Sequence, residues 1–201
     1  MNPIIVIGTS YGGLSALQKV LANLPQEFVA PVVIVQHRTR DQDLDLRSFL
    51  QKRCPLPLRE PEDKEAIAPG IVYLAPRDYH LLIERGGFAL SMDAPISYAR
   101  PSIDVLFESA AEAYGSRLIG VIMTGANADG ANGLAKIKQR GGICIVQEPE
   151  SAEARQMPDA ALAKFAESSY EVDYILPLTA IPQRLFELCD KPEATLTNMM
   201  G

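Results

Sequence analysis

Apolar runs that alternate with helix-forming segments constrain the fold of this chain more than any other feature. They cover Pro3–Gly8, Pro31–Gln36, Leu118–Thr124 and Gly142–Gln147, with Tyr170–Ile175 as a weaker fifth. Short runs that are apolar on both faces are typical of parallel strands covered on each side. Alternation of strand and helix predicts right-handed βαβ units. We therefore expect an α/β fold with a doubly wound, mostly parallel sheet and helices on both faces.

The middle of the chain interrupts this alternation. Three short β-type runs, at Gly70–Ala75, Tyr79–Ile83 and Phe88–Met92, are joined by turn-forming residues and predict hairpins. We expect an antiparallel hairpin insertion in the sheet or at its edge, and a surface connection over the charged, proline-rich stretch Pro55–Pro69. The length of 201 residues suits one domain. It is expected over residues 1–190, with a frayed polar tail over 191–201.

Composition disfavours several functions. The net charge of -6 argues against nucleic acid or anionic lipid as a partner. Met1 leads directly into a strand-like run, and no apolar run is long enough to cross a bilayer, so we expect a cytoplasmic protein. Cys54, Cys144 and Cys189 are far apart and are expected to be reduced core thiols. Together with two histidines they offer no metal-ligand spacing, so no metal ion is expected.

The segment Gly8–Gly13 lies between the first predicted strand and the first predicted helix. In this context a serine hydroxyl stands above the sheet edge where α/β proteins bind ligands. The helix N-terminus adds free N–H groups for a developing oxyanion, so Ser10 is a candidate nucleophile. The same turn is similar to a phosphate loop or a degenerate dinucleotide fingerprint. However, Gln36-His37 stands where that fingerprint needs an acidic residue.

His37 directly follows the second apolar run. A single histidine at a strand end is more often a structural group than a base. Adjacent parallel strands lie about 5 Å apart, so His37 can meet Ser10, and we expect a hydrogen bond between Ser10 Oγ and His37 Nε2. The rival base, His80, lies in the predicted hairpin, and its expected role is a structural hydrogen bond.

Asp129 lies in the small-residue loop that follows the run Leu118–Thr124. It could accept the second imidazole proton and leave His37 Nε2 free as the base. Alternatively, it caps the helix that starts at Gly130 or Ala131. From the residues alone the cap is favoured.

These motifs resemble those of the CheB-type protein-glutamate methylesterases. The matching segments are Ile7–Gly13, Val35–His37, Pro69–Pro76 with His80, Arg100–Phe107, Met123–Ala131 and Met157-Pro158. The resemblance implies that Ser10 is the nucleophile, His37 the general base and acid, and Asp129 the orienting carboxylate, with no cofactor. It also implies hydrolysis of methyl-glutamate side chains on chemoreceptor helices, with release of methanol, and deamidation of receptor glutamines by some members.

Departures from the family pattern concentrate around the expected site. Tyr11 stands where threonine is usual, Arg38–Asp41 replaces Met-Pro-x-Gly-Phe, and Ala126-Asn127 replaces Met-Gly. We expect Arg38 at the substrate rim and the backbone N–H groups of Tyr11 and Ala126 in the oxyanion hole. The common family architecture places a receiver domain before the esterase, whereas this chain begins at the esterase strand. A separate regulatory receiver protein is therefore an expected partner, beside the receptor-like helical protein.

Two other functions stay open at this stage. A catalytically weak or inactive protein-binding module of the same fold would account for Tyr11 and the altered rim. A nucleotide-binding domain would depend on the glycine-rich turn alone. We favour the hydrolase, because it alone uses Ser10, His37 and Asp129 together.

Overall fold

The computed structural model describes residues 3–37, 45–96 and 98–190. Within these ranges a parallel sheet is built from β1 (Ile4–Thr9), β2 (Val32–Gln36), β3 (Leu58–Arg59), β4 (Val72–Leu74), β7 (Leu118–Ile122), β8 (Ile143–Gln147) and β9 (Tyr174–Leu176). The strand order is β3-β4-β2-β1-β7-β8-β9. From β1 the chain first builds outward through β2 and then returns to add β7 on the other side. This reversal makes the β1–β7 boundary the switch point, where such sheets bind ligands.

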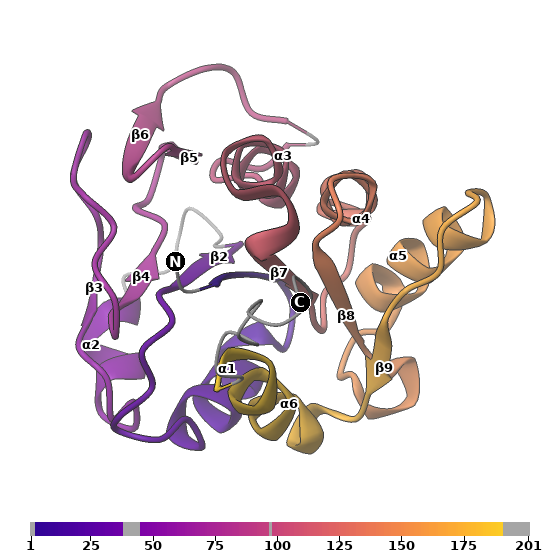
Figure 1. The fold of residues 1–201 in the computed structure, drawn as a ribbon, viewed down its shortest axis with the longest axis horizontal. Coiled ribbons are helices and arrows are strands. Elements are labelled where there is room, and N and C mark those ends of the chain that lie inside the picture. The colour runs from indigo at the N-terminus through magenta and orange to yellow at the C-terminus, as the bar shows by residue number, and fades with distance from the viewer. Residues whose placement is uncertain (1–2, 38–44, 97, 191–201) are drawn as a thin grey trace, which may run out of the picture.

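Helices cover both faces of the sheet (Figure 1). On one face lie α1 (Gly13–Ala22), α2 (Leu46–Gln51) and α6 (Ile181–Cys189). On the other lie α3 (Ile103–Tyr114), α4 (Ala131–Gln139) and α5 (Gln156–Ala166). Short 3-10 turns occur at Gly115–Arg117, Pro149–Ser151 and Leu178–Ala180. The expected doubly wound α/β fold is confirmed.

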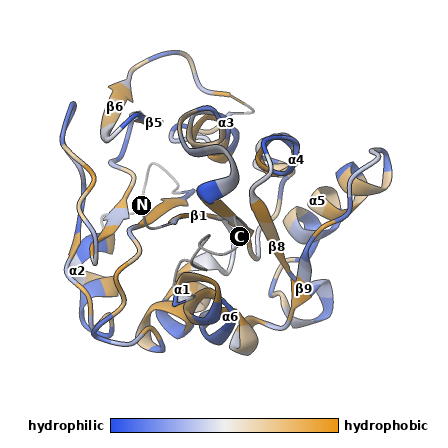
Figure 2. Cartoon of the chain, viewed as in Figure 1, coloured by the Kyte–Doolittle hydropathy of each residue, from blue (hydrophilic) through white to orange (hydrophobic). Residues whose placement is uncertain are grey.

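Alternation along the strands explains this two-sided core. Ile5 and Ile7 pack on the α1 side, whereas Ile4 and Val6 pack on the α3 side. Successive side chains of a strand point to opposite faces, so a strand covered on both sides has to be apolar throughout. Figure 2 shows this as hydrophobic strands between helices that are hydrophilic on their outer surfaces.

The middle of the chain differs in part from the prediction. The expected hairpin is formed by β5 (His80–Glu84) and β6 (Gly87–Ser91), which make an antiparallel sheet of their own beside α3. The run Gly70–Ala75 was wrongly assigned to that insertion, because β4 pairs in parallel with β2. The supposed surface connection Pro55–Pro69 contains β3, which pairs in parallel with β4. Val72, Tyr73 and Leu74 are fully buried, which is the pattern of a doubly covered strand rather than a hairpin arm.

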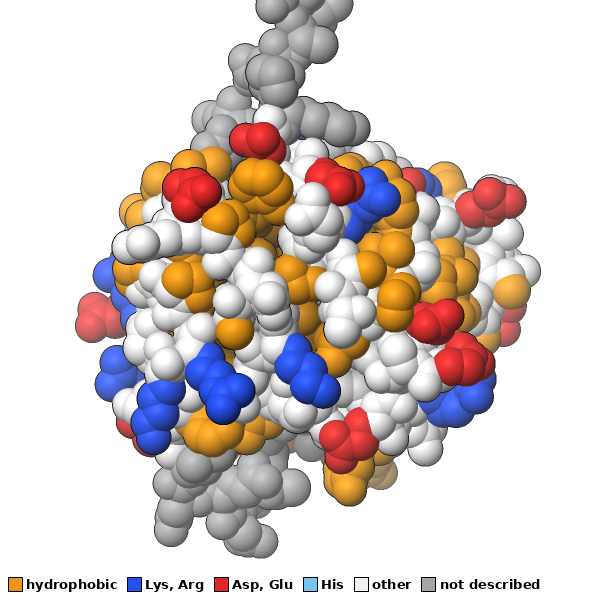
Figure 3. All heavy atoms as spheres, turned by 90° about the horizontal axis from the view of Figure 1, so that it is seen from below, with side chains coloured by type: hydrophobic (Ala, Val, Ile, Leu, Met, Phe, Trp, Pro, Cys, Tyr) orange, Lys and Arg blue, Asp and Glu red, His pale blue; other side chains and the backbone are white. Residues whose placement is uncertain are grey.

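Charged side chains of both signs are mixed on the surface, as the similar numbers of basic and acidic residues predict. The face that α1 and α6 cover carries acidic and basic side chains interspersed with apolar ones (Figure 3). In the part of the chain that the structure describes, no helix combines the length and the apolar character that crossing a bilayer requires. The predicted frayed tail, residues 191–201, lies outside the described residues.

The packing of α3 against α4 generates a stability prediction. A Cβ atom at Gly133 would lie 2.5 Å from Phe107 Cβ. Gly133→Ala should therefore destabilise the fold by about 1–3 kcal/mol through overpacking, although alanine favours an isolated helix by about 1 kcal/mol. Urea unfolding measures this change. Gln139→Ala, at an exposed position of the same helix, is the control, and equal stability of Gly133→Ala and wild type would contradict the close-packed crossing.

Candidate active site

Ser10 and His37 follow neighbouring strands at the same level. Thr9 is paired with Gln36 across the β1–β2 ladder, and the His37 N–H donates to the Thr9 carbonyl at 3.0 Å. Both Ser10 and His37 line a cavity of about 760 Å³. The sheet therefore brings the predicted nucleophile and the predicted base to one cavity beside the switch point.

Close backbone packing shapes the turn that carries Ser10. The Ser10 N–H donates to the Thr124 carbonyl at 3.0 Å, which ties the turn to the end of β7. A Cβ at Gly13 would lie 2.2 Å from Gln36 Oε1, and one at Gly125 would lie 2.9 Å from Ser10 Cβ and 1.8 Å from Met157 Sδ. Glycine is required at both positions because side chains already fill the space. Met157, one of the residues that matched the family pattern, thus packs beneath the site.

Gln36 connects the two halves of the site. Its Nε2 donates to the Ser10 carbonyl at 2.8 Å and to the His37 carbonyl at 2.7 Å. The side chain is buried. One amide group therefore sets the distance between the backbones of the predicted nucleophile and base, a role that the local sequence pattern does not indicate.

His37 is bound at both ring nitrogens. Its Nε2 lies 2.8 Å from Asp129 Oδ2, and its Nδ1 lies 3.0 Å from Asn127 Nδ2. The expectation that Nε2 faces Ser10 is wrong, because Nε2 is the nitrogen that meets the carboxylate. The nitrogen left to act as a base is Nδ1. Among the described residues, Ser10 Oγ makes no hydrogen bond in this state.

Asp129 caps a helix, but not the one that follows it. Its Oδ1 accepts from the Ser102 hydroxyl at 2.9 Å and the Asp104 N–H at 3.0 Å. Its Oδ2 accepts from the Ile103 N–H at 2.7 Å as well as from His37. These N–H groups begin α3, whereas α4 has Gly130 as its N-cap and no side-chain cap. The carboxylate thus binds the positive end of α3 and His37 together.

These contacts explain the ionisation of the two aspartates. Burial alone would raise the pKa of the Asp129 carboxyl, but hydrogen bonds from His37, Asp104 and Ile103 outweigh it, and the pKa lies below its usual value. The pKa of the Asp104 carboxyl lies above its usual value. Burial raises this pKa, the hydrogen bond from Gly133 lowers it in part, and the neighbouring charge of Asp129 raises it further. Asp129 is therefore an ionised acceptor that holds the proton of His37 on Nε2.

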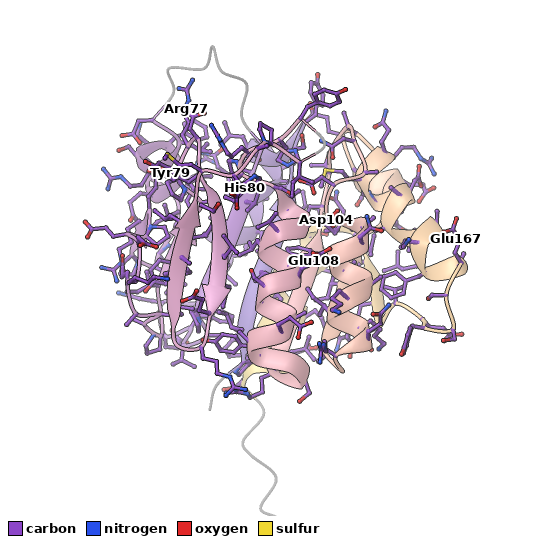
Figure 4. The ribbon with its side chains drawn as sticks, turned by 90° about the horizontal axis from the view of Figure 1, so that it is seen from above. Arg77, Tyr79, His80, Asp104, Glu108 and Glu167 are labelled. Carbon is purple, nitrogen blue, oxygen red and sulfur yellow. The ribbon has the colours of Figure 1, made fainter. Side chains whose placement is uncertain are left out.

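His80 is a structural group, as expected. It is buried, its Nδ1 accepts from the Ser102 N–H at 3.2 Å, and its Nε2 lies 3.1 Å from the Ala94 carbonyl. Figure 4 shows His80 at the same end of the molecule as the turn of α3 that carries Asp104. The second histidine thus fixes Ser102, which in turn donates to Asp129.

Of the remaining predicted site residues, Tyr11 lines the cavity and Ala126 does not. Tyr11 is 64% exposed and lines the cavity, and its backbone N–H makes no hydrogen bond within the described residues, so it is available beside the N-terminus of α1. Ala126 is exposed and is not among the residues that line the cavity, whereas its neighbour Asn127 is. Arg38 lies outside the described residues.

The arrangement suits acyl transfer through a serine rather than through a thiol. Burial raises the pKa of Cys144 and of Cys189 to about 12, so both stay protonated at neutral pH. Within the described ranges no group of three or more His, Cys, Asp or Glu side chains could hold a metal ion. A serine beside a histidine that a carboxylate orients is the arrangement that activates a hydroxyl nucleophile.

Comparison with known proteins gives concordant findings. A family model described as CheB methylesterase matches residues 5–185. A Leptospira interrogans (serovar copenhageni) protein named "Putative protein-glutamate methylesterase/protein-glutamine glutaminase" is 46% identical over 185 residues, which are 92% of this chain and 93% of the relative. The protein-glutamate methylesterase/protein-glutamine glutaminase of Thermotoga maritima is 39% identical over 92% of this chain and 54% of the relative.

A solved structure gives the same result for the fold. The crystal structure of the Thermotoga maritima CheB methylesterase catalytic domain superposes with a TM-score of 0.86 at 37% identity. The match covers 94% of this chain and 99% of that chain.

Removing the donors of Gln36 should disturb both neighbours. Gln36→Met keeps the length of the side chain but leaves the Ser10 and His37 carbonyls without their donor. We expect a loss of stability of about 1–3 kcal/mol and slower reaction of Ser10 with a fluorophosphonate. Urea unfolding and timed labelling measure the two effects. Gln18→Met, on the cavity wall, is the control, and a Gln36→Met protein as stable and reactive as wild type would rule out the bridging role.

The two aspartates should give opposite pH trends in stability. The lowered pKa of Asp129 stabilises the fold above the unfolded value of about 3.9, and this contribution is lost as the pH falls through the folded pKa. The stability difference between wild type and Asp129→Asn should therefore shrink as the pH falls from 5 to 3. Asp104 has a raised pKa, so acid stabilises wild type relative to Asp104→Asn. Unfolding curves across this pH range measure both trends, and parallel trends for the two variants would contradict the assignment.

Proposed function

The chain belongs to the CheB methylesterase family, and from this premise we propose that it hydrolyses glutamate methyl esters through Ser10, His37 and Asp129. The resemblance found in the sequence and the enzyme class are confirmed, since relatives that share 46% and 39% of their aligned residues are named protein-glutamate methylesterase/protein-glutamine glutaminase. These matches favour the hydrolase over the inactive binding module. The observation that carries the residue roles is the 2.8 Å contact between His37 and Asp129 beside Ser10.

The reaction proceeds in two acyl transfers. His37 Nδ1 takes the proton of Ser10 Oγ as the oxygen attacks the γ-carbonyl, and the developing oxyanion accepts from the Tyr11 N–H. Collapse expels the methoxy oxygen, which takes the proton from Nδ1 and leaves as methanol. Water then attacks the acyl-serine with the same proton transfers, and glutamate is released. With glutamine in place of the ester, ammonia leaves in the first step.

Asp129 supports the charged state of this cycle. When Nδ1 takes a proton, His37 becomes an imidazolium, and the ionised carboxylate at Nε2 stabilises it. Because the first turn of α3 holds the carboxylate, Asp129 keeps its negative charge and does not take the proton itself.

We propose a receptor-like helical protein in the cytoplasm as the substrate. Exposed aromatic side chains, Tyr11 and Tyr98, line the cavity that contains Ser10. Aromatic rings at a cavity rim supply contact area to a protein partner at a small entropic cost. A separate receiver protein as a regulator stays a prediction.

Methylated chemoreceptor helices test reaction, substrate and nucleophile together. Wild-type protein should release methanol and convert the methyl-glutamate mass to glutamate, and Ser10→Ala should lower the rate at least about 10³-fold. A fluorophosphonate should label wild type and not the variant. Ser15→Ala, in the same cavity, is the matched control and should keep its activity. Folded wild type that neither labels nor releases methanol would favour the binding module.

A further inference from the structure

Asn127 has a fixed orientation against the catalytic histidine. Its Oδ1 accepts from the backbone N–H of Asp129 at 3.0 Å. The other end of the amide, Nδ2, therefore faces His37 Nδ1 at 3.0 Å. Since Asp129 is ionised and accepts at Nε2, the ring carries its proton there, and Nδ1 accepts from Asn127. Both ends of the imidazole are thus satisfied by protein groups in the free enzyme.

This contact conflicts with the proton transfer that the proposed function requires. Nδ1 has one lone pair, which either accepts from Asn127 or takes the Ser10 proton. After the transfer, Nδ1–H would face the N–H of Asn127, and two donors would oppose each other. Asn127 therefore has to withdraw from Nδ1 before Ser10 can react.

We propose that Asn127 is a positioning residue that restrains His37 in the free enzyme and is displaced when substrate enters. The inference deepens the proposed function and rests on it. Nδ1 also has to protonate the leaving group, so the departing oxygen occupies a place within hydrogen-bond distance of Nδ1. That is where Asn127 Nδ2 now lies. An ester that binds productively takes this place. Asn127 is exposed and lines the cavity, so its displacement breaks hydrogen bonds but does not disturb the core.

The residue type at position 127 differs from that of the CheB-type pattern. The CheB-type pattern has glycine where this chain has Asn127, and glycine has no amide to offer to His37. The restraint thus depends on the amide side chain at position 127. It reduces the fraction of enzyme that is competent to bind substrate, and such a reduction weakens apparent affinity without changing the chemistry of the bound state.

Two substitutions at this position should act in opposite directions. Asn127→Ala frees Nδ1, so a fluorophosphonate should label Ser10 about two- to tenfold faster. KM for the methyl ester should fall by a similar factor while kcat stays unchanged. Asn127→Asp keeps the acceptor for the Asp129 N–H but presents a carboxylate to Nδ1, which holds a proton there. Its labelling should be about tenfold slower or more at pH 7 and should recover as the pH is raised.

If Asn127 had only a structural role, the two substitutions would not change the labelling rate in opposite directions. Slower or unchanged labelling of a folded Asn127→Ala protein, or loss without recovery in both variants, overturns the proposal. Asn127→Gly is the second variant, should Asn127→Ala fold poorly, and is expected to change labelling in the same direction. Thermal unfolding of each variant shows whether a lowered rate reflects a lost fold.

Failure of the proposed function is separable from failure of this inference. Wild type that is inert toward both the fluorophosphonate and the ester contradicts the hydrolase. The ¹⁵N resonance of His37 Nδ1 in the free protein then tests the contact between His37 and Asn127 without the need for turnover. A resonance that is the same in wild type and in Asn127→Ala overturns the restraint, whereas a displaced one supports it.

Discussion

The carboxylate of Asp129 is the group on which the rest of the site depends. It is 4% exposed, and a buried charge without partners would cost several kcal/mol. Its acceptors are instead filled by the first turn of α3, by the Ser102 hydroxyl and by His37. The same contacts therefore hold the β7–α4 loop, the start of α3 and the imidazole in one arrangement. His80 extends this arrangement to the hairpin, which explains why an antiparallel element outside the main sheet contributes to the geometry of the site.

The protein fixes the backbone of the site and its imidazole by different means. Gln36 and the close contacts at Gly13 and Gly125 set the distance between the two strand ends. Asp129 and Asn127 set the tautomer and the tilt of the ring. The first set has no alternative arrangement, because its members are buried and packed without space. The second set includes the exposed amide of Asn127. The His37 ring can therefore exchange this partner while the buried contacts between the strand ends stay in place.

The sequence predicted the strands and the strand-end positions of Ser10 and His37 because both follow from local patterns. Apolar runs mark doubly covered strands, and a glycine-flanked serine marks the turn. The parallel pairing of β4 escaped prediction, since a three-residue strand carries too little periodicity to separate it from a hairpin arm. The cap formed by Asp129 was assigned to the wrong helix, because contact with α3 depends on how two helices cross. The choice between Nε2 and Nδ1 depends on the tilt of a ring, which residue types do not encode.

The central position of β1 has a consequence for how the protein is made. Of the described strands β1 is synthesised first, yet it pairs with β7, so that Gly8 lies opposite Ile122. Contacts of such sequence separation form late and slow the search for the native state. The serine turn is therefore synthesised before Thr124, Asn127 and Asp129, and it stays without these partners until β7 and the loop after it have been translated. A chain interrupted before Asp129 therefore lacks the complete set of Ser10, His37 and Asp129.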